Sequence, residues 1–139
     1  MNIISPPGAV ATLADARVAD GFDAPGLLGW LETAAHAEVD GLPFGVVTMA
    51  HDGTVEHYNV AEAALTGLTP ERVVGRNFFT SVAPCTNNFM VAHRFDTEAE
   101  IDATIDYVFT FRLAPMKVHL RLMKRVGSQL MYLAVRKRD

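Results

Sequence analysis

The sequence lacks the features that several common classes of protein need. Its 139 residues contain one cysteine, so no disulfide can form within the chain, and a reducing compartment suits such a protein. The net charge is −4 at pH 7, which argues against nucleic-acid binding, because phosphate backbones require a basic face. No run of about 18 apolar residues could span a bilayer, and no secretory signal opens the chain. We therefore expect a cytoplasmic protein with no membrane insertion.

Motifs for metals and phosphates are also missing. The five histidines show no metal-ligand spacing, and no glycine-rich phosphate loop occurs. The acidic stretch 96–102 lacks the central glycine that a calcium loop requires, and we interpret it as a solvated connection before the third strand. The sequence therefore predicts no metal site.

Apolar residues make up half of the chain, which is enough for one domain with a substantial core. Alternation of apolar and polar residues, strongest near Tyr107, indicates strands, and an Asp-Gly pair at 52–53 marks a hairpin. The predicted strands cover residues 44–50, 54–58, 105–113, 117–122 and 130–135. Tyr107 and Phe109 lie on the apolar face of the third strand, and Arg121 lies on the polar face of the fourth. Two strands, short helices and three further strands predict an α+β domain with one antiparallel five-stranded sheet.

Helical spacing and capping signals lie before the strands and between them. Asn59 is placed as a helix N-cap and Gly67 as the residue that ends that helix. The predicted helices cover residues 9–19, 26–37, 60–65, 70–74 and a segment from Asn87 or Asn88 through Phe95. We expect residues 1–40 to form a helical cap on one face of the sheet and residues 41–139 to form the core domain, with short helices over the other face.

The segment from Tyr58 to Cys85 holds the residues with chemical potential. A lone cysteine is most often a small buried hydrophobe, but Cys85 follows Ala-Pro and precedes a predicted helix, whose N-terminus favours a thiolate. No histidine flanks it, which leaves a hydrolase-type Cys/His pair without local support.

Glu62 allows two interpretations, whereas Tyr58 and Thr66 each have one ordinary structural interpretation. Glu62 is three residues after Asn59, so it either completes a capping box or lies inward, where a buried carboxyl stays protonated near neutral pH. Tyr58 at the end of an edge strand is ordinarily a packing residue whose hydroxyl finds a partner. Thr66 is ordinarily a residue of the helix C-terminus.

These segments resemble the photoactive yellow protein family, small blue-light receptors with a PAS fold. The matching segments are Asp-Gly-Leu-Pro-Phe-Gly at 40–45, Tyr-Asn-x-Ala-Glu at 58–62, Thr-Gly at 66–67, Val-Gly-Arg-Asn-Phe-Phe at 74–79, Val-Ala-Pro-Cys-Thr at 82–86, Tyr-x-Phe at 107–109, Pro-x-Lys-Val at 115–118 and Val-x-Lys-Arg at 135–138. The resemblance covers residues 26–138. Residues 1–25 are an addition.

The resemblance implies a covalent chromophore, p-coumaric (4-hydroxycinnamic) acid, bound as a thioester on Cys85. Tyr58 and protonated Glu62 would hold its phenolate, with Thr66 supporting Tyr58. The remaining pocket residues implied are Leu68, Phe78, Phe109 and Leu113. In the family, light drives trans–cis isomerisation, proton transfer from the glutamic acid and signalling to a downstream protein. The sequence does not identify that downstream protein. It is compatible with a homodimer.

Two departures from the family pattern keep a second hypothesis open. Leu68 stands where the family has an arginine, and Leu113 where it has a methionine. The stretch between Phe95 and Ile105 is shorter by about three residues. The alternative is a non-photoactive PAS module that binds another ligand or a protein partner. An enzyme that carries an acyl group on Cys85 is disfavoured, because the sequence supplies no general base.

Overall fold

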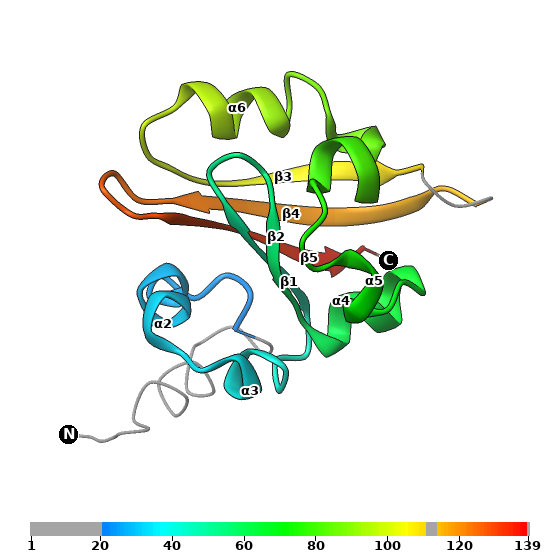
Figure 1. Cartoon of the computed structure of the whole chain (residues 1–139), viewed down its shortest axis with the longest axis horizontal. Coiled ribbons are helices and arrows are strands. Elements are labelled where there is room, and N and C mark those ends of the chain that lie inside the picture. Colours follow the sequence, from blue (N-terminus) through cyan, green and yellow to red (C-terminus); the bar gives the residue numbers. More distant parts are fainter. Residues whose placement is uncertain (1–20, 111–113, 139) are drawn as a thin grey trace.

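The computed structural model describes residues 21–110 and 114–138. Five strands form one antiparallel sheet in the order β2-β1-β5-β4-β3. Figure 1 shows this sheet with helices on both sides. The strands are β1 (Gly45–Ala50), β2 (Val55–Tyr58), β3 (Ile101–Phe109), β4 (Met116–Lys124) and β5 (Leu130–Lys137). The α+β class and the five-stranded antiparallel sheet that the sequence predicts are confirmed.

Short helical elements connect the strands and precede the sheet. They are α2 (Leu27–Thr33), α3 (His36–Val39), α4 (Val60–Thr66), α5 (Pro70–Val73), the π-helical turn η1 (Phe78–Val82), the 3-10 turn η2 (Pro84–Thr86) and α6 (Ala92–Thr97). In Figure 1, α2 and α3 lie below the sheet, whereas α6 lies above it. The described residues include no helix with the length and apolar character needed to cross a membrane, and no group of three or more side chains arranged to hold a metal ion.

The third strand begins earlier than predicted. It starts at Ile101 instead of 105, inside the stretch that we interpreted as an acidic connection. Ile101, Tyr107 and Phe109 are buried, which confirms the inward face, while Asp102 on the outward face pairs with Arg121. An ion pair thus accounts for an acidic residue within a strand. The predicted continuation of this strand through 111–113 lies outside the described residues.

Two helix boundaries were also wrong, and the predicted helix at 9–19 lies outside the described residues. The single helix expected at 26–37 is two, because Ala34 and Ala35 are extended and the Glu38 carboxylate accepts a hydrogen bond from Ala35 N (2.8 Å), which caps a new helix. The helix expected from Asn87 or Asn88 begins at 92. The Asn88 side chain instead joins two turns: its Nδ2 donates to Cys85 O (3.1 Å), and its Oδ1 accepts from Met90 N (2.9 Å).

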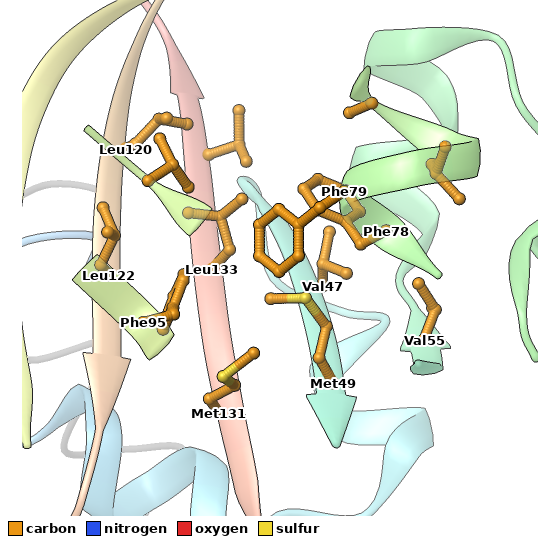
Figure 2. Close-up of a cluster of buried hydrophobic side chains, with 14 of the residues drawn as sticks. Val47, Met49, Val55, Phe78, Phe79, Phe95, Leu120, Leu122, Met131 and Leu133 are labelled. Atoms are coloured by element: carbon orange, nitrogen blue, oxygen red, sulfur yellow. The ribbon is translucent and has the colours of Figure 1, made fainter. Parts of the chain in front are cut away.

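Two hydrophobic clusters lie on opposite faces of the sheet. One lies between the sheet and the segment α4 to α6, and Figure 2 shows side chains from β1, β4 and β5 that point toward Phe78 and Phe79. The other lies between the sheet and the N-terminal segment, and it includes Leu27, Trp30 and Leu31 of α2. We call the second side the cap side. The described part of the predicted cap, residues 21–40, therefore packs on the face away from α4.

Asn59 joins the cap, the sheet and α4. Its Oδ1 accepts hydrogen bonds from Val46 N (2.8 Å) and Glu62 N (3.0 Å). Its Nδ2 donates to Val39 O (2.9 Å) and Phe44 O (3.1 Å). The residue is 0% exposed, and all four hydrogen bonds of its amide group are made. The predicted N-cap is confirmed, and it also fixes α4 against both neighbours.

Candidate functional site

Tyr58 and Thr66 form one buried hydrogen-bonded pair. The strand β2 is at the edge of the sheet and ends at Tyr58. The next helix, α4, ends at Thr66 and places this residue beside Tyr58. Their hydroxyl oxygens are 2.8 Å apart. Thr66 Oγ1 also donates to Glu62 O (3.1 Å) and accepts from Leu68 N (3.3 Å). The role that the resemblance implies for Thr66, a polar partner for Tyr58, therefore agrees with its position.

Glu62 lies inward on α4. Its side chain is 1% exposed, and its Oε1 has no hydrogen-bond partner among the residues that the structure describes. The capping-box alternative is wrong, because Asn59 N donates to Val46 O instead of to the Glu62 carboxylate. Removal from water disfavours the charged form, and burial raises the pKa of Glu62 to about 8. The carboxyl is therefore mostly protonated at neutral pH and can donate a hydrogen bond.

Gly45 makes room for this carboxyl. A Cβ atom at position 45 would collide with Glu62 Oε1 and would lie 3.0 Å from Glu62 Cβ and 3.1 Å from Glu62 Cα. The absence of a side chain on β1 thus lets α4 approach the sheet closely. The sequence analysis missed this residue, because the contact joins two elements and leaves no local pattern.

Burial also acts on Tyr58. Desolvation raises the pKa of its phenol well above the ordinary value, the nearby Glu62 carboxyl raises it further, and the hydrogen bond with Thr66 lowers it in part. Tyr58 is therefore a neutral phenol at any physiological pH. Two buried groups that carry protons, Tyr58 and Glu62, lie close enough to influence one another electrostatically.

Cys85 is in the 3-10 turn η2, and it is partly buried. Its carbonyl oxygen accepts hydrogen bonds from Tyr107 Oη (2.6 Å) and from Asn88 Nδ2 (3.1 Å). Asn88 Nδ2 also contacts Tyr107 Oη at 2.6 Å. The prediction that Cys85 directly precedes a helix was wrong, because α6 begins at Ala92. These side chains, not a helix N-terminus, fix the backbone at Cys85.

The candidate residues border one apolar region. Tyr58, Phe78 and Phe109 belong to the hydrophobic cluster on the α4 side, and Leu68 and Cys85 pack against it. Leu113, the remaining candidate, lies outside the described residues. The region thus has a thiol, apolar walls and two proton-carrying groups. Asn88 and Tyr107, which the sequence analysis did not select as site residues, hold the turn that presents the thiol.

Comparison with known proteins assigns this arrangement to a family. Residues 35–133 match the family model described as the PAS fold. The photoactive yellow protein of Rhodothalassium salexigens is 33% identical over 104 residues, which cover 73% of this chain and 83% of that protein. The photoactive yellow protein of Halochromatium salexigens is 30% identical over 110 residues, which cover 77% of this chain and 88% of that protein.

Solved structures give the same assignment. The crystal structure of the photoactive yellow protein domain from the sensor histidine kinase Ppr of Rhodospirillum centenum matches with a TM-score of 0.72 and 40% identity. The match covers 78% of this chain and 98% of that domain. A PAS domain of an HTR-like protein from Haloarcula marismortui matches with a TM-score of 0.56 but only 18% identity, which shows the fold alone.

Proposed function

The chain belongs to the photoactive yellow protein family of PAS-domain photoreceptors, which are not enzymes, and on this premise we propose that it senses blue light through p-coumaric acid bound as a thioester on Cys85. The observation that carries the proposal is the buried Glu62 carboxyl, whose Oε1 has no partner. Buried polar atoms are almost always hydrogen-bonded, so an orphan oxygen of this kind suggests a missing ligand.

The residues present fit such a chromophore. A buried phenolate requires hydrogen-bond donors in place of water, and Tyr58 and protonated Glu62 can both donate. Thr66 can support this, because its hydroxyl can rotate so that its one proton leaves the bond to Glu62 O and points to the Tyr58 oxygen, which frees the Tyr58 proton for the ligand. The apolar side chains Leu68, Phe78 and Phe109, with Leu113 in the proposal, would exclude water from the ring.

The acyl end would be bound by Cys85. Its sulfur can displace the leaving group of an activated ester, which forms a thioester and releases the leaving group with the thiol proton. The hydrogen bonds from Tyr107 and Asn88 to the Cys85 carbonyl hold the turn in one conformation. A fixed attachment point and a fixed pair of donors suit a rigid, elongated ligand.

When bound, the chromophore supplies visible absorption and light-driven trans–cis isomerisation. Glu62 would hold a proton in the dark and would pass it to the bound phenolate oxygen after illumination. The resulting carboxylate is buried without a counter-charge, which is costly and destabilises the packing of α4. Asn59 binds Glu62 N on α4 and Val39 O at the end of α3, so movement of α4 acts on the cap.

In this proposal residues 41–139 form the photosensory core and residues 1–40 form the segment that responds. The downstream partner is a signalling protein that recognises the altered surface. The second candidate, a PAS module without a photocycle, is favoured by one observation: Leu68 packs against the apolar cluster, where it can supply neither charge nor hydrogen bonds to the site.

Reconstitution tests both candidates. Purified protein would be treated with an activated ester of p-coumaric acid, and its intact mass and visible spectrum would be measured after denaturation and in the native state. We expect one acyl group per chain, a yellow native protein, and bleaching and recovery under blue light. Cys85→Ala should remain colourless, and equal colouring of this variant would refute the proposal. A stable adduct that does not bleach would favour the second candidate.

A further inference from the structure

Two histidine rings are stacked where the cap meets the sheet. The ring centroids of His36 and His57 are 4.0 Å apart, and the ring planes differ by 8°. His36 is the first residue of α3, and His57 is on β2 directly before Tyr58. The stack therefore joins the cap to the strand that carries the phenol of the candidate site.

A carboxylate completes this contact. His57 Nε2 is 3.0 Å from Asp40 Oδ1, and the two side chains are 14% and 35% exposed. Asp40 is the residue that ends α3, where its backbone N–H donates to His36 O (2.9 Å). The imidazole of His57 is thus contacted from both ends of α3, by the ring of His36 and by the carboxylate of Asp40. We call His36, His57 and Asp40 the histidine clasp.

We propose that the histidine clasp is an acid-operated latch: it holds α3 against β2 when the rings are neutral and releases α3 when both rings are protonated. Neutral imidazoles stack, and one N–H of His57 can donate to Asp40. Two protonated rings would bring two positive charges within the stacking distance of 4.0 Å, and the single carboxylate bonded to His57 cannot neutralise both.

The other groups near the clasp do not replace this carboxylate. On α3, Glu38 accepts the hydrogen bond from Ala35 N. On β2, the neighbouring Glu56 is exposed. On the cap side of the sheet, His57 is opposite Thr48, which does not titrate, and Thr48 is opposite Tyr132. Burial raises the pKa of Tyr132, which therefore stays neutral across the range in which histidine titrates.

The direction of the pH effect follows from His57. Burial lowers the pKa of His57, the neighbouring His36 lowers it further, and Asp40 opposes both in part. With a lowered pKa, the closed clasp binds fewer protons than the open form. Its stabilisation is therefore complete above the ordinary histidine pKa of about 6.5, and it is lost as the pH falls through the lowered value.

Amide hydrogen exchange of the full chain without chromophore tests the latch independently of the photoreceptor proposal. Between about pH 8 and pH 5, after correction for intrinsic exchange, the protection of the Val39 and Asp40 amides should fall. The protection factor should fall about tenfold for each unit by which the pKa of His57 in the closed form lies below its pKa in the open form. The amides of Phe95 in α6 and of Glu98, which follows the end of α6, should stay protected.

Variants separate the latch from general acid sensitivity. His57→Gln should remove most of the pH dependence at Val39 and Asp40, and His36→Gln should reduce it in part, because burial lowers the pKa of His57 more than His36 does. His51→Gln, at the exposed turn of the same hairpin, should retain it. The latch is refuted if wild-type protection at α3 does not change with pH, if both clasp variants show the wild-type fall, or if α6 loses protection in parallel with α3.

Discussion

Glu62 and Arg121 are both buried, but their surroundings differ. Arg121 lies on the cap side of the sheet and is 6% exposed. Its guanidinium donates to both carboxylate oxygens of Asp102 (2.8 and 3.0 Å) and to the carbonyl oxygens of Phe22 (2.9 Å) and Ala24 (2.8 Å). Glu62 lies on the opposite side, and its Oε1 has no partner.

This difference separates a structural charge from a chemical one. Each hydrogen bond of Arg121 offsets part of the cost of its burial, so the residue fastens the segment around Phe22 to the sheet. Glu62 has no such compensation. It stays neutral by keeping its proton, and a proton held at a pKa of about 8 can be donated or lost near physiological pH.

The largest expected effect is on Arg121. Arg121→Met should lower the free energy of unfolding by about 3–4 kcal/mol, because two buried carbonyl oxygens lose their donors while Asp102, which is partly exposed, stays solvated. Chemical denaturation measures this. Arg125→Met, which breaks an exposed pair with Glu32, should cost much less, because solvent screens that pair. Equal losses of stability in the two variants would contradict the structural role given to Arg121.

The second prediction concerns the pH dependence that Glu62 gives to the protein without chromophore. The pKa of Glu62 is raised in the folded state, so the folded state binds more protons than the unfolded state above pH 4.5. Stability from this group is therefore fully present below pH 4.5 and is lost as the pH rises toward 8. The loss should reach roughly 3 kcal/mol between about pH 5 and 8.

Denaturation midpoints measured across this range for the wild type and for Glu62→Gln check the prediction. Glutamine does not titrate, so the difference between the two proteins should shrink at acidic pH and widen at alkaline pH in favour of the variant. Parallel pH profiles would show that Glu62 titrates normally, and the contrast with Arg121 would disappear.

The third prediction sharpens the comparison at Gly45. Gly45→Ala should destabilise the protein by about 2 kcal/mol, because the new methyl group collides with the Glu62 side chain and approaches its Cα, so that α4 must shift. Gly29→Ala on α2 is the matched control, since its Cβ meets nothing within 4 Å, and it should stabilise the helix by about 1 kcal/mol. If Gly45→Ala were neutral, close approach would not determine the Glu62 environment.

The smallest expected effect is at Tyr58. Tyr58→Phe removes the hydrogen bond with Thr66 and should cost about 1 kcal/mol in the protein without chromophore. In reconstituted protein, the same change should shift the visible maximum, because one of two proposed donors is lost. Thr66→Val removes the same hydrogen bond from the threonine side and serves as the comparison. An unchanged spectrum in Tyr58→Phe would exclude Tyr58 as a hydrogen-bond donor to the chromophore.

Local patterns in the sequence predicted most of the fold. The alternation around Tyr107 and Phe109 placed both side chains inward, and Asn59 and Gly67 marked the ends of α4, where Gly67 has a φ of 79°. Such signals depend on neighbours along the chain. Boundaries were less reliable: Asp102 was read as part of a loop although it is in β3, because an ion pair across strands leaves no local signature.

The features that sequence patterns could not provide arise from contacts between distant segments. The alternation of β4 placed Arg121 on a polar face, yet the cap covers that face and buries the guanidinium. The spacing of Glu62 from Asn59 fitted a capping box equally well. The hydrogen bond from Asn59 N to Val46 O and the packing of α4 against Gly45 distinguish the two interpretations.

The central claim is that Glu62 is a buried, protonated carboxyl near neutral pH. Infrared spectroscopy of the protein without chromophore measures this directly, with Glu62→Gln as the reference for subtraction. The account predicts a carboxylic-acid carbonyl band that is present at pH 7, absent from the variant, and lost with a midpoint near 8. A difference spectrum that contains only carboxylate bands at pH 6 and above would contradict it.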